Sequence, residues 1–312
     1  MKVKAINIVW LKRDIRSQDH EPLLKAECAG IPYIIIYMFE PSIIEYPDTS
    51  LRHLQFVYHS ILALNKTLEP YNRGVEIFYG EAIDVFNQLK ENFDIKTIFS
   101  FCESGTQTTW KRDKKVKLFT NHHQISWQET QRDGILRGIK NRKGWSKKWH
   151  REMHTSVIQN SYSVSQDHKI EHSFLLPQKF ETQLKEYPKQ YQPAGEQNAW
   201  RYLKSFTQKR GFNYQRHISK PTESRTACSR ISPYLAWGNL SIKQAFQFIG
   251  THPNGTKNDR AFSAMLTRLH WHCHFIQKFE VECSYETSCI NRGYEQLSHK
   301  KNDALIKAWK KG

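Results

Sequence analysis

The chain has 312 residues and carries 47 Lys and Arg against 30 Asp and Glu, which gives a net charge of +17. Its longest apolar run covers residues 33–39 and is far too short to span a bilayer, whereas 17 Phe, 14 Tyr and 9 Trp residues are enough to build a core. We therefore exclude a membrane protein and a disordered chain. We expect two domains of ordinary size and a polyanionic partner such as nucleic acid.

The six cysteines are spread over the chain without a CxxC pair, so we expect neither a zinc ribbon nor a disulfide framework. Cys283 and Cys289 lie near His272 and His274 in the sequence. We favour the interpretation that these cysteines are buried free thiols, and a metal site is the alternative. Residues 1–4 lead directly into a strand-like run without a signal peptide, which predicts a cytoplasmic protein.

Strand-like and helix-like segments alternate over the first 130 residues. Apolar runs and periodicity predict strands at 5–11, 33–39, 75–78, 97–101 and 124–127, with helices near 21–29, 50–69, 81–91 and 106–120. Five strands separated by four helices imply an α/β fold with a parallel, Rossmann-like sheet and right-handed crossovers. No GxGxxG motif follows the first strand, so the usual dinucleotide fingerprint is missing.

We place an α/β domain at residues 1–132, a connector at 133–195 and an all-α domain at 196–312. The basic run 141–154 of the connector contains Trp145 and Trp149. It either contacts DNA or keeps the connector soluble, and we favour solubility. Residues 159–195 are rich in Ser, Gln, Tyr and Pro, which predicts a long connection over the surface.

The segment Cys-Ser-Arg-Ile-Ser-Pro-Tyr-Leu at 228–235 predicts the start of a helix. Ser232 suits the N-cap and Pro233 the first turn, and Arg230 adds a full charge beside the backbone donors of the helix end. This arrangement suits a diphosphate, although on this segment alone an ordinary helix start without a ligand is the favoured interpretation. A second helix, with a capping box at 241–244, is expected to end at Gly250.

A third helix is predicted from about Asp259 to Glu282 and carries two stripes of side chains. The first is a core stripe, made of Phe262, Leu266, Leu269, Cys273 and Ile276. The second mixes a cation, an indole and an imidazole, and consists of Met265, Arg268, Trp271, His272 and Phe275. A cavity wall against a flat, partly anionic ligand fits this mixture, and so does a second packed interface from which the arginine reaches solvent.

Six segments together resemble the photolyase/cryptochrome family of blue-light flavoproteins. They begin with Trp-Leu-Lys-Arg-Asp-Ile-Arg at 10–16, continue at 103–113, 134–145, 195–203 and 228–235, and end with Arg-Leu-His-Trp-His-Cys-His-Phe at 268–275. The resemblance implies an N-terminal antenna domain and a helical domain that binds FAD. It also implies that the partner is DNA containing pyrimidine dimers, which are repaired when light-excited reduced flavin donates an electron to the dimer.

The resemblance also implies roles for single residues. For FAD it assigns Ser229, Arg230, Ile231 and Ser232 to the diphosphate, with Tyr214, Cys228, Arg268 and His272 as further contacts. For catalysis it assigns Trp271, which matches a tryptophan that stacks on the dimer, and Arg268, which stands where many repair enzymes carry a glutamate. For DNA it assigns Arg216, Trp271 and Phe275, and for an antenna pigment of folate or flavin type it assigns Glu103.

Family members continue with a Thr-Gly-Tyr-Pro stretch and a further third of the protein, which carries the residues around the flavin ring and the adenine. These 312 residues do not include that part. We therefore expect a truncated, split or partial gene product that encodes one wall of the FAD site and binds FAD weakly or not at all. A cryptochrome photoreceptor without repair activity and a non-catalytic nucleic-acid-binding remnant are the alternatives to a photolyase.

Overall fold

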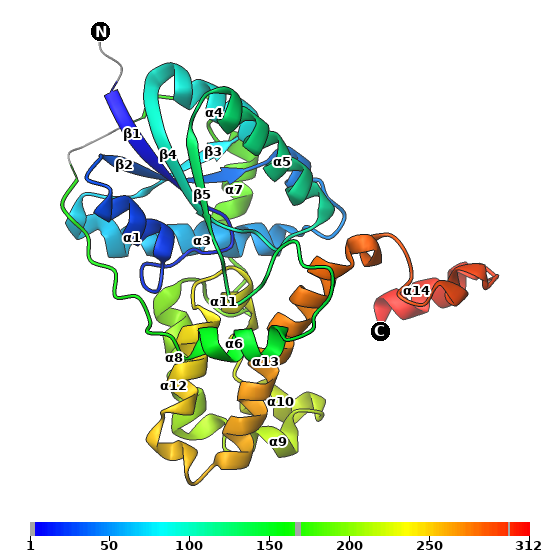
Figure 1. Cartoon of the computed structure of the whole chain (residues 1–312). Coiled ribbons are helices and arrows are strands. Elements are labelled where there is room, and N and C mark those ends of the chain that lie inside the picture. Colours follow the sequence, from blue (N-terminus) through cyan, green and yellow to red (C-terminus); the bar gives the residue numbers. More distant parts are fainter. Residues whose placement is uncertain (1–3, 166–169, 299) are drawn as a thin grey trace.

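The computed structural model of the chain describes residues 4–165, 170–298 and 300–312. An α/β part formed by the N-terminal half rests on a smaller group of helices, and helix α14 (Asp303–Lys311) projects away from both (Figure 1). Two parts of the sequence predictions lie outside the described residues. They are residues 1–3, which lead into the first predicted strand, and residues 166–169 of the predicted surface connection. Within the described ranges no helix is long and apolar enough to cross a membrane.

Five parallel strands form one sheet in the order β3-β2-β1-β4-β5. They are β1 (Lys4–Leu11), β2 (Tyr33–Phe39), β3 (Val75–Tyr79), β4 (Phe93–Phe101) and β5 (Ser126–Thr130). The predicted α/β fold with a five-stranded parallel sheet is confirmed, although β4 starts four residues earlier and β5 two residues later than predicted. The strand order reverses between β1 and β4, which is where open parallel sheets bind ligands beyond the carboxyl ends of their strands.

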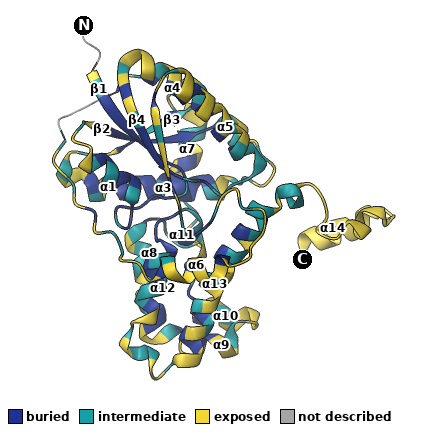
Figure 2. Ribbon diagram, in the orientation of Figure 1, coloured by how far each residue is buried: buried dark blue, intermediate teal, exposed yellow. Residues whose placement is uncertain are grey.

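Helices cover both faces of the sheet. One face packs against α1 (Glu21–Cys28) and α3 (Leu51–Leu68), and the other against α4 (Ala82–Asn92) and α5 (Gln107–His122). All seven residues of β2 are buried, as expected for a strand that is covered on both sides, and β1 and β2 are mostly dark blue in Figure 2. Helix α2 (Pro41–Ile44) and the 3₁₀ turn η1 (Glu69–Tyr71) flank α3 along the chain.

The connector contains two helices, α6 (Trp145–Met153) and α7 (Gln178–Lys185). The prediction of a long surface connection over 159–195 is wrong at α7, because Leu184 is fully buried against α3 and the core beneath the sheet. Phe180 and Leu184 are four residues apart and so lie on one face of a helix. In α6 the side chains of Trp145 and Trp149 are buried in the helical core.

The helical part is built from short elements around the long helix α13. In chain order they are α8 (Glu196–Ser205), the π-helical turn η2 (Phe206–Arg210), α9 (Tyr214–His217), α10 (Pro221–Ala227), α11 (Ser232–Ala236), α12 (Ile242–Gly250), η3 (Pro253–Gly255), α13 (Asp259–Val281), η4 (Cys283–Glu286) and η5 (Arg292–Gln296). The capping box of Ser241 with Gln244 is confirmed. The prediction of Ser232 as an N-cap is wrong: Ile231 takes that position, Ser232 opens the helix, and no side chain caps it.

The turn between α11 and α12 joins the two parts. The backbone N–H of Ile15 donates to the carbonyl oxygen of Trp237 at 3.1 Å, and the Asn239 side-chain amide donates to the Ile15 carbonyl oxygen at 2.7 Å. The Ser241 hydroxyl also donates to Asp19 at 2.6 Å. The loop after β1 is therefore held directly against the helical part, which places the strand ends next to Trp237.

Neither interpretation of the C-terminal cysteines holds. Cys289 is exposed and Cys283 is partly exposed, so they are not buried thiols. Among the described residues no group of three His, Cys, Asp or Glu side chains is placed to hold a metal ion. The buried thiol of the chain is Cys273, in the core stripe of α13.

Candidate functional site

A cavity of about 250 Å³ lies beyond the carboxyl ends of β1, β2 and β4, and we call it the strand-end cavity. Trp10, Tyr37 and Phe39 line it from the sheet, and residues of α2 and α3 line it from the side. Trp237 closes it from the helical part. Small-molecule sites usually have volumes of about 300–1,000 Å³, so this cavity suits a single flat ring system.

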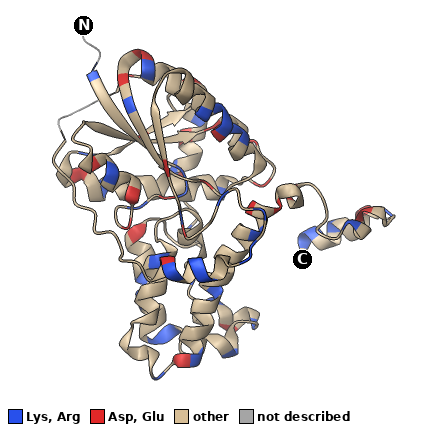
Figure 3. Cartoon of the chain, in the orientation of Figure 1, with Lys and Arg blue, Asp and Glu red and all other residues tan. Residues whose placement is uncertain are grey.

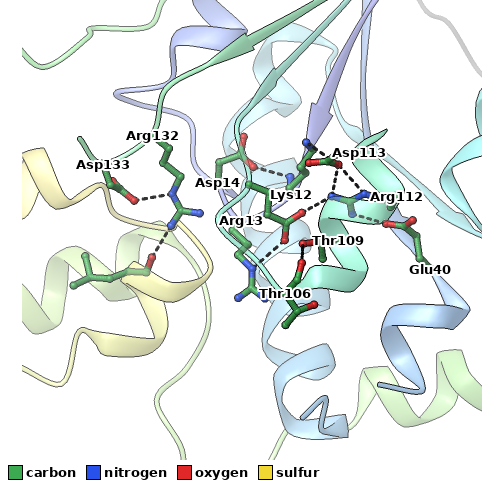
Figure 4. A network of polar contacts seen from close by, with 12 residues as sticks. Lys12, Arg13, Asp14, Glu40, Thr106, Thr109, Arg112, Asp113, Arg132 and Asp133 are labelled. Atoms are coloured by element: carbon green, nitrogen blue, oxygen red, sulfur yellow. Dashed lines mark hydrogen bonds and ion pairs between the residues drawn. The ribbon is translucent and has the colours of Figure 1, made fainter. Parts of the chain in front are cut away.

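A buried network of ion pairs forms the polar wall of the strand-end cavity (Figure 4). The Arg112 guanidinium donates to Glu40 at 2.7 Å, to Glu103 at 2.5 Å and to Asp113 at 2.8 Å. Arg13 donates from Nε to the other oxygen of Glu103 at 3.1 Å. Losing one partner of such a buried pair costs about 3–5 kcal/mol, so the network holds the wall in one arrangement.

The two glutamates of this wall differ in their pKa. Burial alone would raise the pKa of Glu103, but the positive charges of Arg112, Arg13 and Lys12 outweigh it and lower the pKa to about 2. Burial raises the pKa of Glu40, and Arg112 offsets this only in part. Glu103 is thus ionised at every physiological pH and fixes two guanidinium groups, whereas burial disfavours the charged form of Glu40 and Arg112 favours it.

A second polar cluster lies in the helical part around the turn before α11, and we call it the Cys228 cluster. Arg210 donates to the carbonyl oxygens of Thr226 at 2.8 Å and Ser229 at 3.0 Å, and also to that of Cys228. Arg230 follows with φ +62°, a left-handed conformation that is costly for a residue with a side chain and is concentrated at functional sites.

Helix α13 contributes the opposite side of the Cys228 cluster. Arg268 hydrogen-bonds the Tyr214 hydroxyl, and its guanidinium lies 4.6 Å from the ring centre of Trp271. Burial raises the pKa of the Cys228 thiol, although the positive charges of Arg210, Arg230 and Arg268 act to lower it. Those three arginines form no ion pair with a carboxylate within the described part of the chain. Among the described residues the positive charge of the cluster is therefore not neutralised by a carboxylate, which fits a bound polyanion such as a diphosphate.

The structure does not bring all of the expected residues into this cluster. Ser229 is buried and Ile231 lies in the core, whereas Ser232 faces a different hollow beside Arg52. His272 lies near Arg132 and Asp133, and burial lowers its pKa although Asp133 opposes the effect. Arg216 is exposed on α9.

The second stripe of α13 is open to solvent on one side. Trp271 is 46% exposed and Phe275 is 59% exposed, so among the described residues this side is not the packed interface that the sequence allowed. Met265 of the same stripe is buried. The exposed part of the stripe is a wall of one cation and two aromatic rings.

The sequence analysis does not identify two functional candidates, Arg112 and Arg210. Arg112 and Arg210 stand in segments without a motif that predicts their contacts, and each one acts on residues distant in the chain or on backbone carbonyls. Arg112 does lie within the stretch 110–113 that resembles the family. That resemblance was the available signal for it.

Comparisons with known proteins agree with this architecture. The family model for DNA photolyase matches residues 7–161. Deoxyribodipyrimidine photo-lyase of Alkalihalophilus pseudofirmus is 22% identical over an alignment that covers 99% of this chain and 66% of the relative. The chain belongs to the photolyase/cryptochrome family, and it spans 66% of the length of that relative.

Solved structures of the family share the fold. An archaeal photolyase from Sulfolobus tokodaii, solved with two FAD molecules, has a TM-score of 0.75 at 19% identity and aligns over 97% of this chain and 66% of its own. A class III photolyase from Agrobacterium tumefaciens has a TM-score of 0.79 at 17% identity, over 99% and 66%. A cryptochrome from Synechocystis has a TM-score of 0.75 at 17% identity, over 99% and 68%.

Proposed function

We propose that this chain carries the antenna and lesion-facing parts of a blue-light-dependent DNA photolyase, a cytoplasmic lyase that acts on pyrimidine dimers. The observation that supports it best is the exposed Trp271 ring, with the Arg268 guanidinium 4.6 Å from its centre, beside the arginines of the Cys228 cluster, which form no ion pair with a carboxylate among the described residues. An exposed aromatic wall next to uncompensated positive charge suits a base that has left the duplex.

FAD is the cofactor we assign to the Cys228 cluster. Arg230, Arg268 and Tyr214 would hold its diphosphate, with Cys228 and Ser229 in the supporting turn. When bound and reduced, FAD supplies the light-driven electron transfer that splits the dimer. The protein's own contribution is to fix the anionic end of the cofactor through arginines that Arg210 and the turn keep in place. Ser232, Ile231 and His272 remain weaker candidates, since they face other surroundings.

DNA is the partner we assign to the open side of α13. Trp271 and Phe275 provide stacking surfaces, and Arg216 provides a phosphate contact on α9. The net charge of +17 attracts the DNA backbone over a long range. A dimer leaves the duplex at a cost of a few kcal/mol, and stacking on Trp271 returns about 1–3 kcal/mol per base.

The strand-end cavity is the site we assign to an antenna pigment. Its aromatic walls accept a flat ring, and Glu103 supports it by anchoring Arg13 and Arg112. A pigment at the junction of the two parts lies beside Trp237, which connects to the turn of the Cys228 cluster through α11.

A cryptochrome photoreceptor is the second candidate, because Arg268 stands where many repair enzymes carry a glutamate. A guanidinium donates hydrogen bonds and accepts none, so Arg268 cannot receive a hydrogen bond from the N–H groups of a thymine pair. The same flavin would then signal without repair.

The test is an assay of dimer loss. The chain is mixed with excess reduced FAD and an oligonucleotide with one cyclobutane dimer, illuminated with blue light, and the dimers are counted by chromatography. We expect light-dependent loss that Trp271→Ala reduces at least about tenfold. Trp309→Ala is the matched control, since Trp309 is 83% exposed on α14, away from the site. Intact flavin photochemistry without repair supports the photoreceptor, and DNA binding without FAD binding supports a remnant.

A further inference from the structure

Three histidines and an arginine gather where α6 lies beside α13 (Figure 1), and we call this group the histidine strip. His150 belongs to α6, His270 and His274 belong to α13, and Arg142 precedes α6 in the connector. The rings of His150 and His270 are stacked, with centres 5.3 Å apart and planes at 14°. Trp145 is also stacked on His270, at 5.2 Å. Two segments that are distant in the chain thus share one surface of titratable rings.

The long helix places no carboxylate in this strip. Between Asp259 in its first turn and Glu280 in its last turn, α13 has no acidic residue. Glu280 is paired with Arg137 at 3.5 Å. Glu282, which follows the helix, accepts a hydrogen bond from the Tyr285 hydroxyl at 3.1 Å. The acidic side chains at this end of α13 therefore have partners of their own.

The elements packed against α13 add positive charge to the same surface. The single acidic residue of α6, Glu152, lies 3.4 Å from the ammonium group of Lys243 on α12. His154, at the end of α6, is bonded to the carbonyl oxygen of His150 at 2.6 Å. The other charged residues of the connector end, α6 and the middle of α13 are cations, namely Lys143, Lys147, Lys148, Arg151, Arg268 and Lys278. Within the described residues no histidine of the strip has a carboxylate partner.

His274 holds Arg142 only while its ring is neutral. Nη1 of Arg142 lies 3.1 Å from Nδ1 and 2.9 Å from Nε2 of His274. A guanidinium only donates hydrogen bonds, and a protonated imidazole has no acceptor left. Burial and the charges of Arg142 and Lys278 lower the pKa of His274 below its ordinary value of 6.5, so Arg142 is held at neutral pH. A proton on His274 removes this acceptor and releases the exposed Arg142 to solvent.

His270 can gain a proton without losing its contacts. Its Nε2 lies 3.1 Å from the Ser146 hydroxyl, to which a protonated ring can donate. A positive imidazole stacked on Trp145 also gains a cation–π contact. Burial and the charges of His150 and His274 lower the pKa of His270, so this charge also appears below pH 6.5. Acidification therefore adds positive charge to the strip while α6 stays packed on α13.

The histidine strip borders the exposed aromatic wall of α13. The ring centre of His274 lies 5.4 Å from that of Phe275, which lies 6.5 Å from that of Trp271. A duplex whose base stacks on Trp271 continues beyond it as a line of phosphates. Arginine and protonated histidine are suitable donors to such phosphates.

We propose that the histidine strip binds the DNA backbone beside the Trp271 wall, and that protonation of His270 and His274 strengthens this contact by adding charge and releasing Arg142. This inference rests on the DNA partner proposed above and adds a second contact surface and its control by protons. It assigns to DNA the basic run 141–154, for which solubility was the favoured interpretation. The affinity for DNA should therefore rise as the pH falls below about 6.5.

The experiment measures binding of a labelled duplex by fluorescence anisotropy at pH 7.5 and pH 5.5 and at constant salt. For the wild type we expect the Kd to fall about tenfold or more at the lower pH, because charge-assisted hydrogen bonds to phosphate are added. The slope of log K against log salt should steepen by at least about one. Circular dichroism at each pH identifies the lowest pH at which the chain is folded, and affinities are compared down to that pH.

Two variants separate the strip from the other histidines. The double variant His270→Gln with His274→Gln should reduce the gain in affinity to less than about threefold, since neither glutamine takes up a proton. Arg142→Gln should weaken binding about tenfold at pH 5.5 and less than about twofold at pH 7.5, where His274 holds the arginine. His122→Gln, at an exposed position on α5 in the α/β part, is the control that should keep the full gain.

The remaining outcomes count against the inference. If DNA binds with the same affinity at both pH values, or if the double variant gains as much as the wild type, the inference is wrong and the DNA partner stands. Equal weakening by Arg142→Gln at both pH values would show a contact without proton control, and the inference would again be wrong. If the duplex does not bind at either pH, the proposed DNA partner fails, and the inference fails with it.

Discussion

Gly238 lies in the turn that joins the two parts, with φ +75° and its Cα against the loop after β1. A Cβ at this position would lie 2.2 Å from the Arg13 carbonyl oxygen and 2.5 Å from Cα of Asp14. Both are backbone atoms and cannot rotate away. We expect Gly238→Ala to lower the free energy of unfolding by more than about 2 kcal/mol, measured by urea denaturation.

Gly30→Ala is the matched control. Gly30 has φ +66°, and no atom lies within 4 Å of an added Cβ, so only the left-handed backbone should cost free energy, about 1–2 kcal/mol. Equal losses in the two variants would contradict a close approach at Gly238.

His20 and Asp14 form a buried pair next to the same loop. His20 Nε2 lies 2.9 Å from the Asp14 carboxylate, and Nδ1 accepts the N–H of Leu23 at 3.2 Å, which leaves no room for a second proton. Burial lowers the pKa of His20 below its ordinary value of 6.5, although Asp14 opposes the effect. The unfolded chain therefore binds the extra proton, and stability falls as the pH decreases through 6.5.

We expect the Tm to fall as the pH is lowered from about 7.5 to about 5.5. His20→Gln should reduce the slope of Tm against pH. Circular dichroism melting at several pH values measures it. Several other histidines have a pKa shifted in the same direction, namely His53, His123, His270, His272 and His274. The difference between variant and wild type therefore isolates His20, and identical slopes would contradict the assignment.

At the scale of elements, α7 anchors the connector to the α/β part. Leu184 is fully buried, and its neighbour Gln183 is exposed. Truncating a buried leucine to alanine costs about 2–5 kcal/mol, so we expect Leu184→Ala to shift the urea midpoint clearly downward. Gln183→Ala should change the free energy of unfolding by no more than about 0.5 kcal/mol. A small effect of Leu184→Ala would show that α7 does not hold the connector.

The sequence predicts the elements that have strong apolar patterns. Runs such as 33–39 identify the strands, and the spacing from Phe262 to Cys273 identifies α13. It misses α7, because a helix of eight residues between prolines carries only two core positions. It misplaces Ser232, because Ser-Pro is compatible with two positions at a helix start.

The candidate site is less predictable than the fold. The neighbourhood of Tyr214, Cys228 and Arg268 is expected from the family's motifs, and the structure places the three together. The contacts of Arg112 and Arg210 depend on strands and turns that meet only in the folded chain. Local periodicity carries no information about such contacts.

At the scale of the whole molecule, positive charge dominates the helical part. Lys and Arg recur along its helices and α14 with few acidic residues among them (Figure 3). We expect DNA affinity to fall steeply with salt, and Arg216→Ala to reduce the slope of log K against log salt by about one. Fluorescence anisotropy with a labelled duplex measures this. Lys90→Ala on α4, in the α/β part, should leave the slope unchanged, and an effect as large as that of Arg216→Ala would contradict the proposed face.

The binding of FAD at the Cys228 cluster is the claim on which the rest of the account depends. The most direct test is a titration of the chain with FAD in which the flavin absorption band at about 450 nm is monitored. We predict a weak but saturable change that pyrophosphate reverses and that Arg230→Gln weakens at least about tenfold. The absence of any saturable change, or an affinity unaltered by Arg230→Gln, would contradict the account.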